Sequence, residues 1–432
     1  MKHVPARIVA AGYVILVLIG TLLLKLLAVH PISFFDAAFT ATSALTVTGL
    51  TVVNTASHFS GAGQFVLLLL IQIGGLGWLT LALVAARGIG IELGVAEMYV
   101  ASRENGGRLG SVFAVALGVL RTALVVQGIG ACLLAAMLWM NGLRPATALW
   151  WGVFHSISAF NNAGFDVTGQ GLVLFVGHWG VTLVVAALVF LGGLGFGVLS
   201  ELRSGFRRRR LSIHTAVVLS VSAILLAVGT LLLYSLDRNG ALAGLSEPNR
   251  WLAAFFHAVS ARTAGFHTVD IAAFSNAGLF VIVLLMFIGA SPVSTGGGIR
   301  TTTLAVAVSA VVSYGAGNRQ VNLAKRQVPD DLIRRALVLI VGAGILLMAC
   351  TLLLLALEPE ITPMALLFEA VSAFATVGLS TGITAELSSA AQMILMLLML
   401  VGKLGLLSVL SISFRRNDSK VQFPTADSMI VG

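Results

Sequence analysis

Phe154-His-Ser-Ile-Ser-Ala-Phe-Asn-Asn-Ala-Gly164 is one of four similar stretches that decide the fold of this chain. Each stretch begins with Phe, carries a Ser-Ala pair, ends in Gly and lies between two long apolar runs. The spacing from Ser to Gly is six residues in three copies and five in the third. The other copies are Phe39-Thr-Ala-Thr-Ser-Ala-Leu-Thr-Val-Thr-Gly49, Phe256-His-Ala-Val-Ser-Ala-Arg-Thr-Ala-Gly265 and Phe368-Glu-Ala-Val-Ser-Ala-Phe-Ala-Thr-Val-Gly378.

The composition is that of a protein embedded in a membrane. Of the 432 residues, 58% are hydrophobic and 10% are charged, and the mean hydropathy is +1.01. A soluble domain has about 25% charged residues. We therefore expect an all-α polytopic membrane protein. Apolar runs long enough to cross a bilayer recur along the chain, for example Ile8 to Leu24, Val66 to Ala86 and Ala336 to Leu357.

The four copies divide the chain into four similar units that share one pattern. A span is followed by a short re-entrant helix, a filter strand and a second span, which gives eight transmembrane helices. The expected units are 1–94, 95–205, 206–318 and 319–432, the last including a C-terminal tail. The expected spans lie near 8–29, 63–86, 110–139, 172–200, 212–235, 276–312, 334–357 and 388–413, and the re-entrant pieces at 33–50, 147–165, 249–266 and 363–379.

The basic residues predict how the chain is oriented in the membrane. Eighteen of the 26 Lys and Arg residues fall in five segments, and the positive-inside rule places these segments and both termini in the cytoplasm. The run Arg207 to Arg210 lies between two spans, so the net charge of +9 does not require a nucleic-acid partner. The five segments are the amino terminus, 87–108, 203–210, 319–335 and 415–420.

Four short segments that converge from similar units predict one ring of backbone carbonyls around an axis, as in an ion selectivity filter. Glycine suits such turns because it takes positive φ without a Cβ clash. The alternative is four glycine turns that only pack between helices. The residues alone predict that the filter passes a monovalent cation, and they do not specify which cation. The predicted ion-binding residues are Thr46, Val47, Thr48, Gly49, Asn161, Asn162, Ala163, Gly164, Thr263, Ala264, Gly265, Ala375, Thr376, Val377 and Gly378.

A second constellation, Gly289-Ala-Ser-Pro-Val-Ser-Thr-Gly-Gly-Gly-Ile-Arg300, interrupts the second span of the third unit. A continuous helix through it would cost several kcal/mol, roughly 1 per Gly and 3 for Pro. We expect helix, loop over 289–299, and helix, with a static kink as the alternative. Arg300 and Lys403 also lie inside expected spans. Because a lone cation there costs ~2.5–3.5 kcal/mol, each needs partners.

Six short motifs resemble those of the membrane subunit of the Ktr/Trk superfamily of potassium transporters. The resemblance covers essentially the whole chain, and its length and short amino terminus are more similar to the Ktr type. The motifs are Thr48-Gly-Leu50, Asn161-Asn-Ala-Gly-Phe165, Arg262-Thr-Ala-Gly-Phe266, Thr376-Val-Gly-Leu-Ser380, Ser294-Thr-Gly-Gly-Gly-Ile-Arg-Thr-Thr-Thr303 and Val401-Gly-Lys-Leu-Gly405.

The resemblance implies a pseudo-fourfold pore for K⁺ uptake across the bacterial inner (plasma) membrane. Gly49 favours K⁺, since relatives with Ser at this place tend to pass Na⁺. A sodium-selective or poorly selective transporter of the same architecture is the alternative. The resemblance also makes the interrupted segment a gate below the filter, in which Pro292 would stiffen the loop. The implied gate residues are Ser294, Thr295, Gly296, Gly297, Gly298, Arg300 and Lys403.

The resemblance also implies partners. They are membrane lipid, a second copy of the chain contacted through the tail 423–432, and a cytosolic ring of nucleotide-binding regulatory subunits. The sequence has no nucleotide-binding fingerprint of its own. We expect no cofactor in this chain, with K⁺ as the transported ion and Na⁺ as a candidate activator.

An enzymatic alternative rests on His155, His257 and Glu369, which each follow the Phe of their copy. Two histidines and a carboxylate are a known metal-binding set, so an intramembrane metalloenzyme is a remote alternative. Fourfold symmetry would place the three side chains on separate helices around a pore. The sequence also lacks zinc-protease spacing and a nucleophile elbow. We therefore expect a transporter and no enzyme activity.

Overall fold

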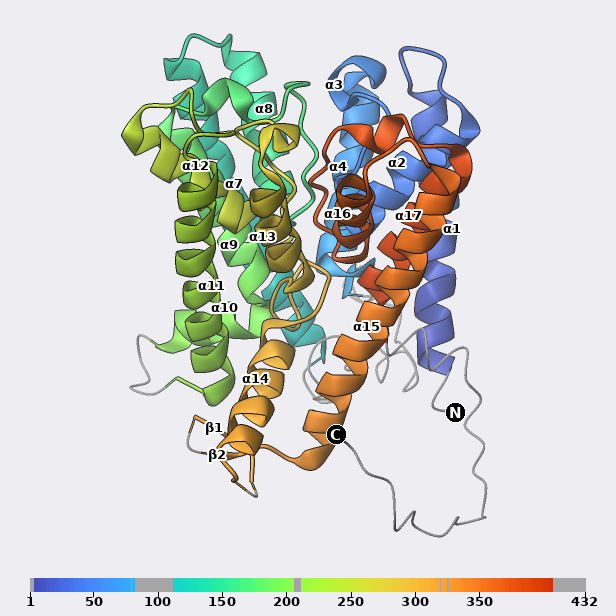
Figure 1. The fold of residues 1–432 in the computed structure, drawn as a ribbon. Coiled ribbons are helices and arrows are strands. Elements are labelled where there is room, and N and C mark those ends of the chain that lie inside the picture. Colours follow the sequence, from blue (N-terminus) through green and yellow to red (C-terminus); the bar gives the residue numbers. More distant parts are fainter. Residues whose placement is uncertain are drawn as a thin grey trace.

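The computed structural model describes residues 4–78, 80–81, 112–205, 211–318, 320–324 and 326–406. It is a bundle of helices (Figure 1). The elements are α1 (Val4–Leu26), α2 (Phe34–Thr46), α3 (Thr55–His58), α4 (Gly61–Leu76), α7 (Val112–Met140), α8 (Pro145–Phe160), η2 (Val173–Phe175), α9 (Trp179–Leu194), α10 (Phe196–Gly205), α11 (Ile213–Asp237), α12 (Glu247–Ser260), η3 (Ile271–Ala273), α13 (Asn276–Phe287), α14 (Thr301–Gly315), β1 (Asn322–Leu323), β2 (Arg326–Gln327), α15 (Asp330–Leu357), α16 (Pro363–Phe374), η4 (Ile383–Ala385) and α17 (Ser389–Leu404).

Four of the described helices, α1, α7, α11 and α15, are long and apolar enough to cross a membrane, and a fifth candidate is the bent pair of α9 and α10. Large apolar side chains on the long helices are exposed, such as Leu22, Val125 and Ile345 at 62%, 60% and 66%. Exposed apolar surface of this extent suits contact with lipid. The expected multi-pass membrane protein is confirmed, and the long helices coincide with the first expected span of each unit.

A short helix follows each long one, in the upper half of Figure 1: α2, α8, α12 and α16. Ser33 starts α2, because its hydroxyl accepts the N–H of Asp36 at 2.9 Å. Pro145, Pro248 and Pro363 stand in the first turn of the other three helices, where a missing N–H breaks no helical bond. These helices occupy the expected re-entrant pieces.

Serines begin the second apolar helix in three of the units. Ser60, Ser275 and Ser388 are the N-caps of α4, α13 and α17, and each hydroxyl accepts a backbone N–H three residues further on. Two of them are also bonded to the end of the preceding long helix. The N–H of Ser275 donates to the Asp237 carboxylate and that of Ser388 to the Glu358 carboxylate, each at 2.7 Å. These bonds fix the start of α13 and α17.

One of the second spans is sharply bent. α9 and α10 meet at Gly195 at an angle of 103°, so the span expected near 172–200 is not one straight helix. The φ angle of Gly195 is 89°, and Gly77 and Gly405 end α4 and α17 with φ angles of 83° and 82°. These angles are left-handed and cannot continue an α-helix, so each helix ends at its glycine.

The third unit differs from the others in having two helices separated by a longer segment. α13 ends at Phe287 and α14 begins at Thr301, and residues 288–300 between them are not helical. Beyond α14, β1 and β2 form a small antiparallel hairpin with Ala324 in its turn at a φ angle of 50°. The expected all-α fold class is confirmed, and the hairpin, with two residues in each strand, is a small addition to it.

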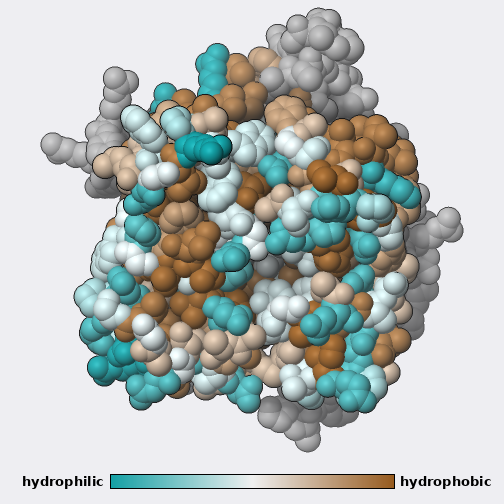
Figure 2. Space-filling model, turned by 90° about the horizontal axis from the view of Figure 1, so that it is seen from above, coloured by the Kyte–Doolittle hydropathy of each residue, from teal (hydrophilic) through white to brown (hydrophobic). Residues whose placement is uncertain are grey.

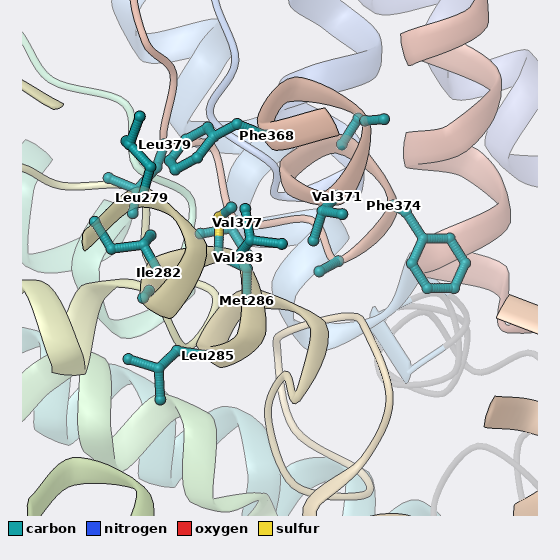
Figure 3. Close-up of a cluster of buried hydrophobic side chains, with 14 of the residues drawn as sticks. Leu279, Ile282, Val283, Leu285, Met286, Phe368, Val371, Phe374, Val377 and Leu379 are labelled. Atoms are coloured by element: carbon teal, nitrogen blue, oxygen red, sulfur yellow. The ribbon is translucent and has the colours of Figure 1, made fainter. Parts of the chain in front are cut away.

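The second apolar helix of each unit packs on the short helix of the next. α4 packs against α8, α9 against α12, α13 against α16, and α17 against α2, so the order closes a circle. Figure 3 shows the contact of α13 with α16, where Val283 and Met286 of α13 lie beside Val377, which follows α16. Buried apolar contacts of this kind fix the short helices in place.

Three glycines allow α4, α9 and α17 to touch the short helix that precedes each of them in the chain. A Cβ at Gly74, Gly192 or Gly402 would lie 1.9, 1.9 or 1.8 Å from a carbonyl oxygen at the C-terminal end of α2, α8 or α16. Real Cβ atoms essentially never approach other atoms more closely than 3.0 Å. Any side chain at these positions would therefore push the end of the short helix away.

Candidate functional site

Each short helix is followed by a tight turn that ends in one of four glycines, called here the ring glycines: Gly49, Gly164, Gly265 and Gly378, with φ angles of 98°, 69°, 77° and 87°. Each ring glycine lies against the carbonyl that precedes the next ring glycine. The fourth contact returns to the first turn, so the four turns form a closed ring. The distances from an ideal Cβ are 2.4 Å from Gly49 to Ala163 O, 2.9 Å from Gly164 to Ala264 O, 2.5 Å from Gly265 to Val377 O and 2.0 Å from Gly378 to Thr48 O.

The residue two places before each ring glycine is left-handed as well. Val47, Asn162, Thr263 and Thr376 have φ angles of 59°, 59°, 80° and 51°. Such angles are uncommon outside glycine, above all for β-branched residues. Each costs of order 1–3 kcal/mol and persists only where the surroundings impose it. The same strained turn is thus built four times.

The serine of the repeated Ser-Ala pair holds each turn. The hydroxyls of Ser43 and Ser372 accept the N–H of the ring glycine six residues later, both at 3.0 Å. The hydroxyls of Ser158 and Ser260 donate instead to the carbonyl of the Phe that follows their ring glycine. Sequence analysis gave these serines no role, although their recurrence before each glycine was a signal for one.

The side chains of several predicted filter residues are bonded within the protein. The Thr46 hydroxyl donates to the Thr42 carbonyl at 2.7 Å, and the Asn161 amide donates to the Gln72 side chain at 2.8 Å. Asn162 and Thr263 lie in neighbouring turns, and their side chains are hydrogen-bonded at 2.9 Å in either orientation of the amide. All are fully buried. The side-chain oxygen of Asn161, in contrast, is buried and accepts no hydrogen bond.

A cavity of about 310 Å³ lies on one side of the ring, lined by the residues that follow the turns. Figure 2 looks onto this end of the molecule, where hydrophilic residues are spread among hydrophobic ones. Asp166 and Asp270 line the cavity together with His267. Burial lowers the pKa of the His267 imidazole, although the two carboxylates act to raise it. At pH 7 the imidazole is therefore neutral and adds no positive charge to the cavity.

The segment 288–300 lies against the other side of the ring, where the turns begin. A Cβ at Gly296 would stand 2.2 Å from the Thr263 hydroxyl oxygen. A Cβ at Gly297 would stand 2.5 Å from the Thr376 hydroxyl oxygen and 2.9 Å from the Ala375 carbonyl. Only glycine fits this closely, so the segment is pressed against the third and fourth turns.

Two neighbouring units hold the segment 288–300. The Thr295 hydroxyl donates to the Gly192 carbonyl of α9 at 3.2 Å. From the other side, the Lys403 ammonium of α17 donates to the Thr295 carbonyl at 2.8 Å. Lys403 therefore has the polar partner that its charge requires inside the membrane.

Arg300 and Ser294 hold the same segment from within. The Arg300 guanidinium donates to the Ser291 carbonyl at 3.3 Å and to the Gly296 carbonyl. The Ser294 hydroxyl donates to the Ser291 carbonyl at 2.6 Å. Gly298 completes the fold-back with a φ angle of 73°. All seven predicted gate residues thus belong to one contact network or its immediate backbone.

His155, His257 and Glu369 do not gather at one point. The imidazoles of His155 and His257 bond to the carbonyls of Trp151 and Ala253 in their own helices, at 2.7 and 2.8 Å. Glu369 bonds to a segment after α16. Among the described residues, no three His, Cys, Asp or Glu side chains form a metal site. The metalloenzyme alternative has no geometric support.

A helical membrane bundle with a closed ring of strained turns, an acidic cavity on one side and a tethered segment on the other defines a membrane transport protein. The chain belongs to the TrkH family of cation transport proteins, which matches residues 4–420. The expected membership of the Ktr/Trk superfamily is confirmed, and the protein is a transporter, not an enzyme.

Similar proteins span nearly all of the chain. The Ktr system potassium uptake protein B of Vibrio alginolyticus is 37% identical over 99% of this chain and 94% of its own. The potassium/sodium uptake protein NtpJ of Enterococcus hirae is 34% identical over 91% of this chain and 89% of its own. The crystal structure of TrkH from Vibrio parahaemolyticus has the same fold, with a TM-score of 0.70 and 19% identity over 93% of this chain and 84% of that one.

Some expectations fall outside the described residues. They are the cytoplasmic position of the basic segments 87–108 and 415–420, the dimer contact of the tail 423–432, and the far ends of the spans expected at 63–86 and 388–413.

Proposed function

We propose that this protein takes up potassium ions through one pore on the axis of the ring glycines. The observation that carries the proposal is the ring, in which each glycine turn lies against the carbonyl of the next. Backbone carbonyls gathered on one axis replace the hydration shell of a dehydrated cation. The name of the Vibrio alginolyticus relative, a potassium uptake protein, supports K⁺ as the ion.

We further propose that four non-identical repeats, 1–94, 95–205, 206–318 and 319–432, build this pore with eight crossings and both termini in the cytoplasm. The circular packing of second helices on short helices supports the repeats. Non-helical backbone at membrane depth is tolerated only where it is buried in protein or lines a water-filled path. The buried turns between long apolar helices fit that condition.

The segment 289–299 is the proposed gate. Its glycines fill the space directly against the third and fourth turns, which obstructs a path along the axis. We propose that Lys403 and Arg300 hold the gate closed, because both donate hydrogen bonds to carbonyls of this segment. Pro292 fixes one backbone torsion near its start, which stiffens that half of the loop.

We propose that the transporter works in a bacterial plasma membrane as a homodimer with a cytosolic nucleotide-binding ring. The Vibrio alginolyticus relative is named as part of a Ktr system, which supports partner subunits. Na⁺ has two candidate roles here, as activator or as cargo. The Enterococcus hirae relative is named for both ions, so a poorly selective or sodium-selective transporter is the second candidate.

The test is ion flux into liposomes that contain the purified full chain. We expect K⁺ and Rb⁺ to enter under an inside-negative potential and Na⁺ to enter more slowly. Faster Na⁺ entry would favour the second candidate, and absence of flux for all three ions, with and without a potential, would contradict both.

A further inference from the structure

A buried carboxylate lies behind the fourth turn of the ring. Glu369 of α16 is fully buried, and both of its oxygens accept hydrogen bonds. One oxygen accepts the Ser380 hydroxyl at 2.6 Å and the Thr381 N–H at 3.1 Å. The other accepts the Thr384 hydroxyl at 2.8 Å. Three donors on one carboxylate offset much of the cost of burying it.

The bonded residues belong to the backbone that leaves the fourth turn. Ser380 and Thr381 follow Gly378 by two and three residues, and Thr384 lies in η4. The Thr384 carbonyl in turn accepts the Gln392 amide of α17 at 3.1 Å. Glu369 therefore fastens the outgoing end of the turn to the helix that precedes it, and this end is tied to α17 as well.

The matching positions in the other copies are used differently. Thr40, His155 and His257 each bond to a carbonyl four residues earlier in their own helix. The second ring nitrogen of His155 is buried without a hydrogen-bond partner, whereas His257 also interacts with the backbone of Val269, beyond its ring glycine. The hydrogen bonds of Glu369, in contrast, cross from α16 to the segment that follows the fourth turn. The fourth turn is thus braced through a carboxylate with three donors, whereas the matching Thr40 and His155 bond to their own helices.

The fourth turn also touches both of its neighbours in the ring. The Val377 carbonyl lies against Gly265, and Gly378 lies against the Thr48 carbonyl. A shift of its outgoing end would therefore move one carbonyl of this turn and press on one carbonyl of the first turn. The position of Glu369 lets it control this geometry without touching an ion.

We propose that Glu369 is a positioning residue that holds the fourth turn in register and thereby sets how well the ring distinguishes K⁺ from Na⁺. The inference rests on the proposed function, in which the ring binds the transported ion. Glu369 acts through Ser380, Thr381 and Thr384 on the carbonyls of Thr376 and Val377.

The test compares Glu369→Ala, Glu369→Gln and the parent in liposomes, with the K⁺ to Na⁺ flux ratio as the readout. Glu369→Ala removes all three acceptor contacts, and we expect the ratio to fall about fivefold, the factor that corresponds to one net hydrogen bond of ~1 kcal/mol. In Glu369→Gln, the remaining side-chain oxygen still accepts the Thr381 N–H. The Thr384 hydroxyl can rotate so that its oxygen accepts a hydrogen bond from the new amide NH₂. We expect its ratio to stay within about twofold of the parent.

Asp237→Ala is the matched control. Asp237 is also a fully buried carboxylate, and it accepts the Ser275 N–H and hydroxyl at the start of α13. Its loss should lower the unfolding temperature and leave the flux ratio unchanged, so a general loss of stability would not imitate the Glu369 effect. The unfolding temperature in KCl against NaCl is the second readout. The parent should be more stable in KCl, and Glu369→Ala should lose that difference.

The outcomes separate the two proposals. A parent that prefers K⁺ together with a Glu369→Ala variant that prefers it equally would overturn the role of Glu369 alone. A parent that prefers K⁺ in neither readout would overturn the proposed function and this inference with it. If Glu369→Ala does not fold, Thr384→Val removes one of the three bonds. An unchanged ratio in that folded variant would equally overturn the inference.

Discussion

Replacing Gly49 by serine tests the ring of turns at its first member. The φ angle of Gly49 is 98°, a region that side-chain-bearing residues rarely adopt, and an added Cβ would stand 2.4 Å from the Ala163 carbonyl oxygen. Real Cβ atoms keep at least 3.0 Å, so the oxygen must move by at least the 0.6 Å difference. The same Cβ would meet the Cα of Gly164 at 3.1 Å, so this Cα must give by a few tenths of an ångström.

The magnitude follows from Coulomb's law. Moving half a charge from roughly 3.0 to 3.6 Å from a monovalent ion, at an effective dielectric constant of about 20, costs ~0.5 kcal/mol. Displacement of the Ala163 carbonyl therefore weakens ion binding roughly twofold. The left-handed backbone adds ~1–2 kcal/mol of strain to the fold. We expect Gly49→Ser to fold, with lower stability, and to lose about twofold in the K⁺ to Na⁺ flux ratio.

Gly142→Ser is the control for backbone strain. Its φ angle is 91°, close to that of Gly49, but no atom lies within 4 Å of an added Cβ. Gly142→Ser should therefore lose stability through backbone strain alone, measured as the unfolding temperature of the purified protein, and only Gly49→Ser should lose selectivity in liposome flux. A Gly49→Ser protein that is folded and as selective as the parent would refute the reasoning.

Two further predictions concern the proposed gate. Deleting residues 294–298 removes the glycines pressed against the third and fourth turns, so basal K⁺ flux without any regulatory partner should rise; parental flux from a folded variant would show that the segment is not the obstruction. Lys403→Gln weakens the 2.8 Å bond to the Thr295 carbonyl, a charged hydrogen bond worth about 1.5–3 kcal/mol, and should also raise basal flux, whereas Lys403→Arg keeps a charged donor and should stay near the parent. Equal flux from all three proteins would leave Lys403 a purely structural residue.

The positions of the short helices and ring glycines were predictable because each copy combines local signals. Pro145 and Pro363 favour helix starts, and the glycines at the ends of the copies permit positive φ. The left-handed angles at Val47 and Thr376 were not predictable, since β-branched residues disfavour them and only the packing of the assembled ring imposes them. At the ring, the packing of the four turns overrides the local backbone preference of these residues.

The helix ends at Gly77, Gly195 and Gly405 were also missed. An isolated glycine in an apolar run is compatible with a continuous helix and costs only about 1 kcal/mol there. The bond from Lys403 to Thr295 joins residues 108 positions apart, and local sequence carries no information on such a distance. The circular order of the units likewise depends on long-range packing of one helix on another.

The most direct measurement is the position of Rb⁺ in crystals of the full chain, located by its anomalous scattering. The account predicts a peak on the axis of the ring, close to the carbonyls of Thr48, Ala163, Ala264 and Val377, that weakens when K⁺ competes and persists in Na⁺. An ordered ring without a peak in Rb⁺, or a peak only outside the ring, would contradict the claim that these carbonyls bind the transported ion.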